Sequence, residues 1–427
     1  MRLHHDLARR ARRAARDRRA GRLAAAIALV VATAACGSAG SSGGPAATTS
    51  GVASKGTYTI GVLSDITGPA SSVHGSTPGG IRAGVALAAR SGYTVKYVVA
   101  DTQTTPAGTL AAAQLLVTQK HVLAVIANSA LTFAASDYLT AHNVPVIGPA
   151  EDATEWITAK NMFSIYGALH PTRVATTVGA FFKAQGVARL ASLGYAVPTS
   201  SLASEAWAAS ARAAGVDVAY LNSKFPLGST DVGPTVLAMK NAGVDGLVMS
   251  VQPNTAFALI TALRDQGVSL KVALIPTGYG GDLTQAGPGA VQAAQGVYFL
   301  LGFEPVEMGT AATKQFVDDL KSGGVTGEPT FAQYQGYVSM ALLVDALKGT
   351  GGGVTQQTLL TALANIHDFT AAGLYGDHKL DVNDRENAVN GVDNCTWIVK
   401  LTGRVFQPVK GAVPICGTPV PGVTVSS

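Results

Sequence analysis

The residues of this 427-residue sequence that could support chemistry are a serine in a glycine-rich segment, eight histidines and three cysteines. Gly40, Ser42 and Gly44 match the G-x-S-x-G of serine hydrolases, but no expected strand precedes them and no helix follows, so a nucleophile elbow is excluded. No histidine lies in a zinc-protease or nucleophile pattern. We therefore expect no catalytic residue, no metal ion and no cofactor. An exported hydrolase is the alternative that these absences disfavour.

The glycine-rich loop after the apolar run Thr59–Ser64 could bind a nucleotide phosphate in an enzyme. Its glycines, however, lack the G-x-G-x-x-G and G-x-x-x-x-G-K-[ST] spacings that bring a phosphate to a helix N-terminus. The glycines and Pro69 instead predict turns that carry the chain across the carboxyl end of a sheet, where α/β proteins bind ligands. The loop favours ligand binding without catalysis.

The N-terminal segment is typical of an export signal. Residues 1–22 contain nine arginines, and Leu23–Ala35 is apolar, uncharged and too short to cross a bilayer. Cys36, which follows two alanines, resembles the lipidated cysteine of bacterial lipoproteins, although Thr33 replaces the usual leucine. An ordinary signal peptide with a spare cysteine is the alternative. We expect residues 1–35 to be a signal peptide and the Gly/Ser-rich residues 36–56 to be a flexible tether.

The chain's surplus of five basic charges comes from this signal segment. Removing the nine arginines and two aspartates of residues 1–35 leaves 22 basic and 24 acidic residues. The mature chain is therefore near neutral, and its composition does not favour a nucleic-acid partner.

Cys395 and Cys416 remain as a pair in an exported chain, where disulfides persist. A bridge that closes a loop of about 20 residues contributes roughly 3 kcal/mol to stability. Two free thiols or a metal pair are the alternatives, but no histidine lies near either cysteine at metal-ligand spacing in the sequence. We expect a disulfide.

Strands and helices must alternate along the chain to position these segments. Short apolar, β-branched runs predict strands at 58–64, 94–100, 122–127, 144–148, 189–195, 216–221, 244–250 and 270–276. Alanine-rich segments with helical spacing lie between them, at 105–119, 132–142, 170–186, 200–214, 231–242 and 254–267. This order predicts the α/β class, with parallel sheets covered by helices on both faces.

The mature chain is longer than a chain that usually forms a single hydrophobic core, so we expect two similar lobes. Residues 293–305 are expected to cross back between the lobes. They are followed by expected helices at 309–322, 330–348 and 355–366 and a late β segment at 394–406. The predicted boundaries are 57–168 plus 299–380 for lobe 1 and 169–298 plus 381–427 for lobe 2.

Two stretches carry a resemblance to a known family. The run "IGVLSDITGPASSVHG" and the helix after it resemble the opening of type I periplasmic solute-binding proteins of the leucine/isoleucine/valine-binding kind. The run "VIANSALTFAASDYLTAHNVPVIGPAEDAT" is similar to that family's next signature. The likeness covers about residues 57–407 and is more general in the second lobe. It implies two lobes, joined by three crossings, that close on a solute and deliver it to an ABC importer.

The resemblance implies ligand contacts in the first lobe. His74 stands where the family often has an aromatic side chain, and a solvated loop histidine is the alternative. Ser129 matches a hydroxyl that holds a ligand carboxylate or amide, and a cap for the helix at 132–142 is the alternative. Ala150 and Asp152 match a backbone-plus-hydroxyl pair in which a carboxylate replaces the hydroxyl. Asp152 with Glu155 also matches a capping box.

In the second lobe the implied contacts rest on looser spacing. Tyr195 ends a strand in the region of a ligand-contacting tyrosine, with packing as the alternative, and Gln252 aligns with an aromatic contact. Thr277, Gly278 and Tyr279 align with the loop that supplies an acid to amino-acid ligands. This chain has no acid at Thr277.

Together these features predict a monomeric solute-binding lipoprotein, anchored outside the cytoplasm by lipid, that delivers a small polar solute to an importer permease. Glu151 and Asp152 would repel a ligand carboxylate, and the second lobe offers no acid for an ammonium group. We therefore expect an amide, a urea-like compound or an amine rather than an ordinary amino acid. A ligand-sensing lipoprotein that serves a receptor is the alternative.

Overall fold

The computed structural model describes residues 53–150, 154–167, 169–170, 172–287, 289–386, 389 and 391–426. The predicted signal peptide, the predicted lipidation site Cys36 and the predicted ligand residue Asp152 lie outside these residues. Val52–Ser427 forms one compact unit.

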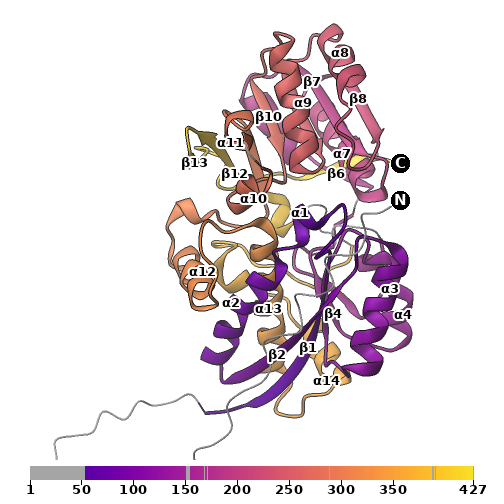
Figure 1. Cartoon of the computed structure of the whole chain (residues 1–427), viewed down its shortest axis with the longest axis vertical. Coiled ribbons are helices and arrows are strands. Elements are labelled where there is room, and N and C mark those ends of the chain that lie inside the picture. Colours follow the sequence, from indigo (N-terminus) through magenta and orange to yellow (C-terminus); the bar gives the residue numbers. More distant parts are fainter. Residues whose placement is uncertain are drawn as a thin grey trace, which may run out of the picture. The chain divides into compact units, whose positions relative to one another are not determined.

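The first sheet has five parallel strands in the order β2-β1-β3-β4-β5. These strands are β1 Gly56–Ser64, β2 Tyr93–Asp101, β3 Val125–Asn128, β4 Val146–Gly148 and β5 Met162–Ser164. Helices α2 (Thr77–Arg90) and α13 (Phe331–Gly349) cover one face, and α3 (Pro106–Gln114) and α4 (Phe133–Ala141) cover the other (Figure 1).

Successive side chains of β1 explain why both faces of the first sheet are covered. Ile60 and Val62 pack in the same buried cluster as Ile81 of α2, whereas Leu63 packs with Ala113 of α3. Both faces of a parallel sheet are thereby removed from water, and the strands are continuous apolar runs. Helix α2 approaches α13 closely at Gly80, where a Cβ atom would lie 2.1 Å from the Gln333 carbonyl oxygen.

The second sheet has the order β13-β12-β11-β10-β9-β7-β8, and β14 pairs with β12. Its strands are β7 Arg189–Tyr195, β8 Asp217–Phe225, β9 Gly246–Ser250, β10 Val272–Ile275, β11 Tyr298–Leu301, β12 Cys395–Thr402, β13 Val405–Pro408 and β14 Ile415–Cys416. Strands β7 to β11 are parallel, and β12 joins β11 in the antiparallel sense.

Helices cover both faces of the second sheet as well. Helices α6 (Thr177–Ala184) and α7 (Pro198–Ala213) share a buried cluster with Leu190 and Val248, and helices α8 (Gly233–Asn241) and α9 (Pro253–Asp265) share another with Leu247. The remaining described α-helices are α1 Ser71–His74, α5 Glu155–Thr158, α10 Gly281–Gln285, α11 Ala290–Ala293, α12 Ala311–Ser322 and α14 Gln356–Ala364. The predicted fold class, parallel sheets covered by helices on both faces, is confirmed.

Two features differ from the sequence-based expectations. The helix predicted at 170–186 begins only at Thr177, because Arg173–Ala175 forms strand β6, which pairs with β15 (Pro419–Thr424). A partner more than 200 residues away has overridden the local helical spacing. In addition, β11 pairs within the second sheet, so the predicted lobe boundary at residue 299 passes through a strand. The lobe boundaries remain a proposal.

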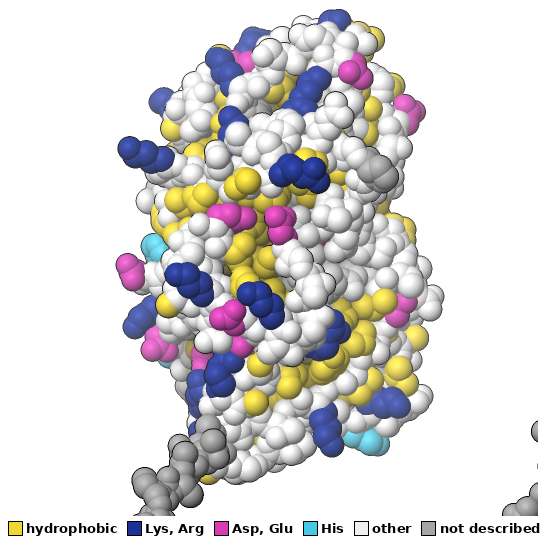
Figure 2. All heavy atoms as spheres, turned by 60° about the vertical axis from the view of Figure 1, so that its left-hand side comes forward, with side chains coloured by type: hydrophobic (Ala, Val, Ile, Leu, Met, Phe, Trp, Pro, Cys, Tyr) yellow, Lys and Arg dark blue, Asp and Glu magenta, His cyan; other side chains and the backbone are white. Residues whose placement is uncertain are grey.

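Among the described residues, no helix is of the membrane-spanning kind, and the face drawn in Figure 2 has no patch of a single charge sign. No described helix combines the length and the apolar character needed to cross a bilayer. On the face drawn in Figure 2, basic and acidic side chains are interspersed. This distribution agrees with the near-neutral composition of the chain after residue 35.

Candidate functional site

A cavity of about 360 Å³ lies where the carboxyl ends of strands from both sheets meet. From the first sheet it is lined by residues that follow β1, β3 and β4, namely Ala70, Val73, His74, Ala130 and Ala150. From the second sheet it is lined by residues at or after the ends of β7, β9, β10 and β11, namely Tyr195, Val197, Val251, Gln252, Pro276, Thr277 and Gly302. Ligands of α/β proteins bind at this end of the strands.

The cavity wall is mostly apolar. Helix α7 contributes Ala203, Ala206 and Trp207, and other segments add Leu227 and Phe331. Among the described lining residues, His74, His170 and Arg173 can carry a positive charge. No Asp or Glu is among these described lining residues. The described wall therefore suits a solute with an apolar body.

His74, a predicted ligand residue, lines the cavity but is tied to the protein. Its Nδ1 atom lies 2.8 Å from Oδ2 of Asp65, and both side chains are buried. Asp65 directly follows β1, and His74 ends helix α1 in the same loop. The backbone carbonyl of His74 accepts hydrogen bonds from the hydroxyls of Ser64 (2.9 Å) and Thr77 (2.7 Å). The alternative for His74, a solvated loop histidine, is thus not what the structure shows.

Ser129, another predicted ligand residue, does not line the cavity. Its hydroxyl donates to Oδ1 of Asp65 at 2.6 Å and accepts from the backbone N–H of Leu131 at 3.2 Å. The residue that lines the cavity here is the neighbouring Ala130, whose N–H also donates to Asp65, at 2.9 Å. The helix-capping alternative is not seen either, because α4 begins at Phe133 after Thr132.

Asp65 was not singled out from the sequence, although a charged residue directly after a buried strand was the available signal. Burial alone raises the pKa of its carboxyl, but the hydrogen bond and positive charge of His74 lower it. The hydroxyls of Ser129 and Thr102 lower it further, and the net pKa lies below the usual value. Asp65 is therefore a carboxylate at neutral pH.

Ala150 lines the cavity through a left-handed backbone. Its φ angle of 58° is uncommon for a residue with a Cβ atom, and the residue is 5% exposed. Asp152, predicted to act with it, lies outside the described residues.

Three predicted residues of the second sheet line the cavity. The Tyr195 hydroxyl donates to Thr255 Oγ1 at 2.7 Å and accepts from the backbone N–H of Gln252 at 3.2 Å. The Gln252 side chain reaches the first sheet's loop, where its Nε2 donates to the Pro69 carbonyl at 2.8 Å. The Thr277 hydroxyl donates to the carbonyl of Val251 at 2.8 Å. Burial raises the pKa of Tyr195, which keeps its phenol neutral.

Gly278 and Tyr279, also predicted as ligand residues, are not among the described residues that line the cavity. Gly278 has a φ of 86°, which turns the chain so that Tyr279 enters the protein core. The Tyr279 hydroxyl donates to Glu307 Oε2 at 2.6 Å, and its ring contacts Phe406. An aromatic residue after a strand end can pack in the core or line a cavity, and Tyr279 packs in the core.

His170 and Arg173 line the cavity but were not predicted from the sequence. His170 lies on the segment that leads from the first sheet to β6, and Arg173 is the first residue of β6. Each donates to a backbone carbonyl of residues 385–386. His170 Nε2 donates to the Arg385 carbonyl at 2.6 Å. Burial, together with the charge of Arg173, lowers the pKa of His170, so its ring is neutral at neutral pH.

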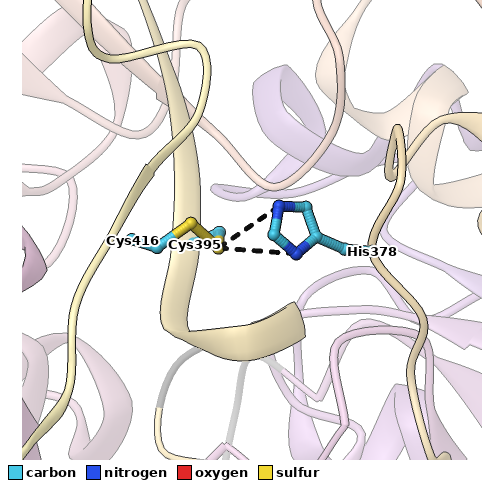
Figure 3. Close-up of side chains that lie close together, drawn as sticks. All are labelled: His378, Cys395 and Cys416. Atoms are coloured by element: carbon cyan, nitrogen blue, oxygen red, sulfur yellow. Dashed lines mark hydrogen bonds between the residues drawn. A yellow bond between two sulfur atoms is a disulfide. The ribbon is translucent and has the colours of Figure 1, made fainter.

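Cys395 and Cys416 are joined by a disulfide in the structure, and the ring of His378 lies beside it (Figure 3). Cys395 Sγ lies 3.8 Å from His378 Nε2, and His378 Nδ1 lies 2.8 Å from Asp393 Oδ2. The expectation that no histidine lies near these cysteines held only along the sequence. Because the two sulfurs are bonded to each other, they are not thiolate ligands in this state.

Comparisons of the structure show the same fold in solved proteins. A solute-binding protein of an ABC transporter from R. palustris, in complex with 4-hydroxybenzoate, has a TM-score of 0.70 and 20% sequence identity, with 85% of this chain and 98% of that chain covered. A leucine-binding protein from Thermotoga maritima has a TM-score of 0.69 and 18% identity, with 84% and 99% covered.

A third solved protein is the branched-chain amino acid transporter substrate-binding protein from Streptococcus pneumoniae in complex with isoleucine. It has a TM-score of 0.68 and 20% identity, with 83% of this chain and 99% of that chain covered. None of the curated proteins matches the chain by sequence. The family profile described as "Periplasmic binding protein" matches residues 57–404. Since this match spans most of the sequence, the chain belongs to the periplasmic binding protein family.

Proposed function

We propose that the protein is the solute-binding component of an ABC importer, which captures a small solute between its two sheets and delivers it to a permease. The observation that carries this proposal is the cavity built from the strand ends of both sheets. Its volume of about 360 Å³ lies in the range of small-molecule sites. Membership of the periplasmic binding protein family supports the same function and an extracytoplasmic location.

Contacts between the two sheets' segments support capture by closure. Gln252, after β9, donates to the Pro69 carbonyl after β1. The N–H of Gly281 in α10 donates to the Pro329 carbonyl just before α13, at 3.1 Å. Such bonds form and break when two lobes close and open on a solute. Lipid anchoring at Cys36 remains part of the proposal and rests on the sequence.

The solute we propose has an apolar body and a polar group. The apolar wall of Trp207, Leu227 and Phe331 favours the body. The expectation of a neutral or cationic solute rests on Glu151 and Asp152, outside the described residues, and stays a prediction. The similar solved proteins hold 4-hydroxybenzoate and isoleucine, and both molecules combine an apolar body with polar groups.

A thermal-shift screen of the purified protein tests the proposal. The panel pairs solutes with aromatic or branched aliphatic bodies, as acids and as amides or amines, with wholly polar compounds such as urea. We expect a saturable rise in Tm with at least one apolar-bodied solute, because a ligand that binds only the folded state stabilises it. Saturable stabilisation by wholly polar compounds alone would contradict the proposed solute class.

A ligand-sensing role on the same fold is the second candidate, because the cavity alone does not distinguish a transported solute from a signal. A gene for an importer permease beside this gene favours transport, and a receptor kinase gene there favours sensing.

A further inference from the structure

We infer that the Asp65 carboxylate occupies an oxyanion-binding position beside the cavity and thereby withholds two of its donors from solutes in the cavity. The part of this inference that concerns solutes rests on the proposed function. The part that concerns the oxyanion position does not.

Four donors from three loops converge on the Asp65 carboxylate. Oδ2 accepts from His74 Nδ1 at 2.8 Å and from the Ala130 N–H at 2.9 Å. Oδ1 accepts from the Ser129 hydroxyl at 2.6 Å and from the Thr102 hydroxyl. The loops follow β1, β2 and β3, which are neighbours in the first sheet. Asp65 itself has no exposed surface.

These donors form an oxyanion site by their chemistry. A carboxylate is an acceptor only, with about four lone-pair directions on its two oxygens, and here each oxygen has two donors. Two hydroxyls, a backbone amide and an imidazole would hold a small free carboxylate in the same way. The site is therefore filled by the chain's own side chain.

Two of the four donors also form the cavity wall. His74 and Ala130 line the cavity on one side and hold Asp65 on the other. A solute carboxylate in this part of the cavity cannot use His74 Nδ1 or the Ala130 N–H, because Asp65 already accepts from both. Asp65 therefore withholds two donors from a solute carboxylate, independently of Asp152.

The test is an anion rescue in the full chain. Asp65→Ala removes a carboxylate and leaves space of about the size of formate among donors without an acceptor. We expect its Tm to fall by at least about 3 °C, and formate at tens of millimolar to restore at least half of the loss in a saturable way. Formamide, which has the same shape without the charge, should restore little.

Two control variants define the result. Asp137→Ala removes an exposed carboxylate on α4, so it measures the general effect of formate, which we expect to be small. Asp65→Asn fills the same space and should lose stability without responding to formate. A response of Asp65→Ala no larger than that of Asp137→Ala, or equal rescue by formamide, would overturn the inference.

Ser129→Ala tests the same network with Asp65 retained, and so covers the case in which Asp65→Ala does not fold. Loss of one donor should raise the pKa of the Asp65 carboxyl, followed by NMR, and an unchanged pKa would overturn the inference. Neither experiment uses the solute. If they succeed while no solute binds the wild-type protein, the proposed function fails and the oxyanion position stands.

Discussion

At the scale of single residues, the strand-end positions were predictable and their partners were not. The resemblance to solute-binding proteins singled out His74, Ala150, Tyr195, Gln252 and Thr277, and all five line the cavity. A sequence shows where a strand ends, and the ends of parallel strands meet at one edge of a sheet. The hydrogen bonds to Asp65 were not predicted, because their donors lie on three loops that are distant in the sequence. Buried carboxylates are also uncommon.

Gln252→Ala tests the bond between the two sheets' loops. The variant loses the donor to the Pro69 carbonyl. One hydrogen bond contributes about 0.5–1.5 kcal/mol net, so we expect roughly 2- to 10-fold weaker solute binding by calorimetry. Gln357→Ala, on the exposed surface of α14, is the matched control and should bind like the wild type. Unchanged affinity in Gln252→Ala would show that this bond does not stabilise the solute-bound form.

At the scale of elements, strand and helix order followed from local pattern, and distant pairings did not. The parallel strands are apolar runs between turn residues, which a sequence displays directly. The short strand pair β6–β15 joins residues 173–175 to residues 419–424. No local sequence pattern predicts this pairing. The contact of α10 with α13 likewise depends on the folded chain. The buried carboxyl of Asp282 at the contact of α10 with α13, and the disulfide that joins β12 to β14, can each be tested.

Asp282 on α10 should make stability fall as pH rises. Its carboxyl is buried, accepts from the Phe331 N–H at 3.1 Å, and has a pKa raised to about 7 by burial, against a usual 3.8. Between these values the folded state holds a proton that the unfolded state lacks. Stability therefore declines by up to about 1.4 kcal/mol per pH unit from about pH 4 to 7.

Urea unfolding at pH 5 and pH 8 measures this slope. Asp282→Asn cannot titrate, so its loss of stability between the two pH values should be smaller than that of the wild type. Asp318→Asn, an exposed carboxylate on α12, should behave like the wild type. Equal losses in the wild type and Asp282→Asn would contradict the assignment.

The disulfide between Cys395 and Cys416 should hold β14 and the C-terminal segment against β12. The cysteines are 21 residues apart, so removing the bridge in Cys395→Ala/Cys416→Ala should cost roughly 3 kcal/mol of unfolding free energy. Wild-type protein treated with a reductant should lose a similar amount. Peptide mapping without reduction should show the two peptides linked, and free thiols at both positions in natively exported protein would refute the bridge.

At the scale of the whole molecule, the fold class followed from the alternation of strands and helices, and the family from two motifs of the first sheet. The solute was less predictable, because the apolar wall comes from α7 and from residues 227, 300 and 331, which share no motif. Capture between two sheets further requires that the solute favour one arrangement of them over another.

Small-angle scattering should detect that shift. We expect the radius of gyration to decrease when a solute from the screen saturates the protein, because closure brings the two sheets together. Gln252→Ala should show the same decrease at a higher solute concentration. An unchanged radius at saturation would indicate a receptor that binds without closing.

The most direct measurement is calorimetric titration of that solute into two variants of one helix. Ala203 of α7 lines the cavity, whereas Ala209 of the same helix is also half-buried and is not among the described lining residues. Leucine at position 203 should fill part of the cavity and weaken binding at least about 10-fold, which corresponds to about 1.4 kcal/mol. Ala209→Leu should bind one solute per chain with wild-type affinity. Wild-type affinity in Ala203→Leu would contradict the central claim that this cavity holds the solute.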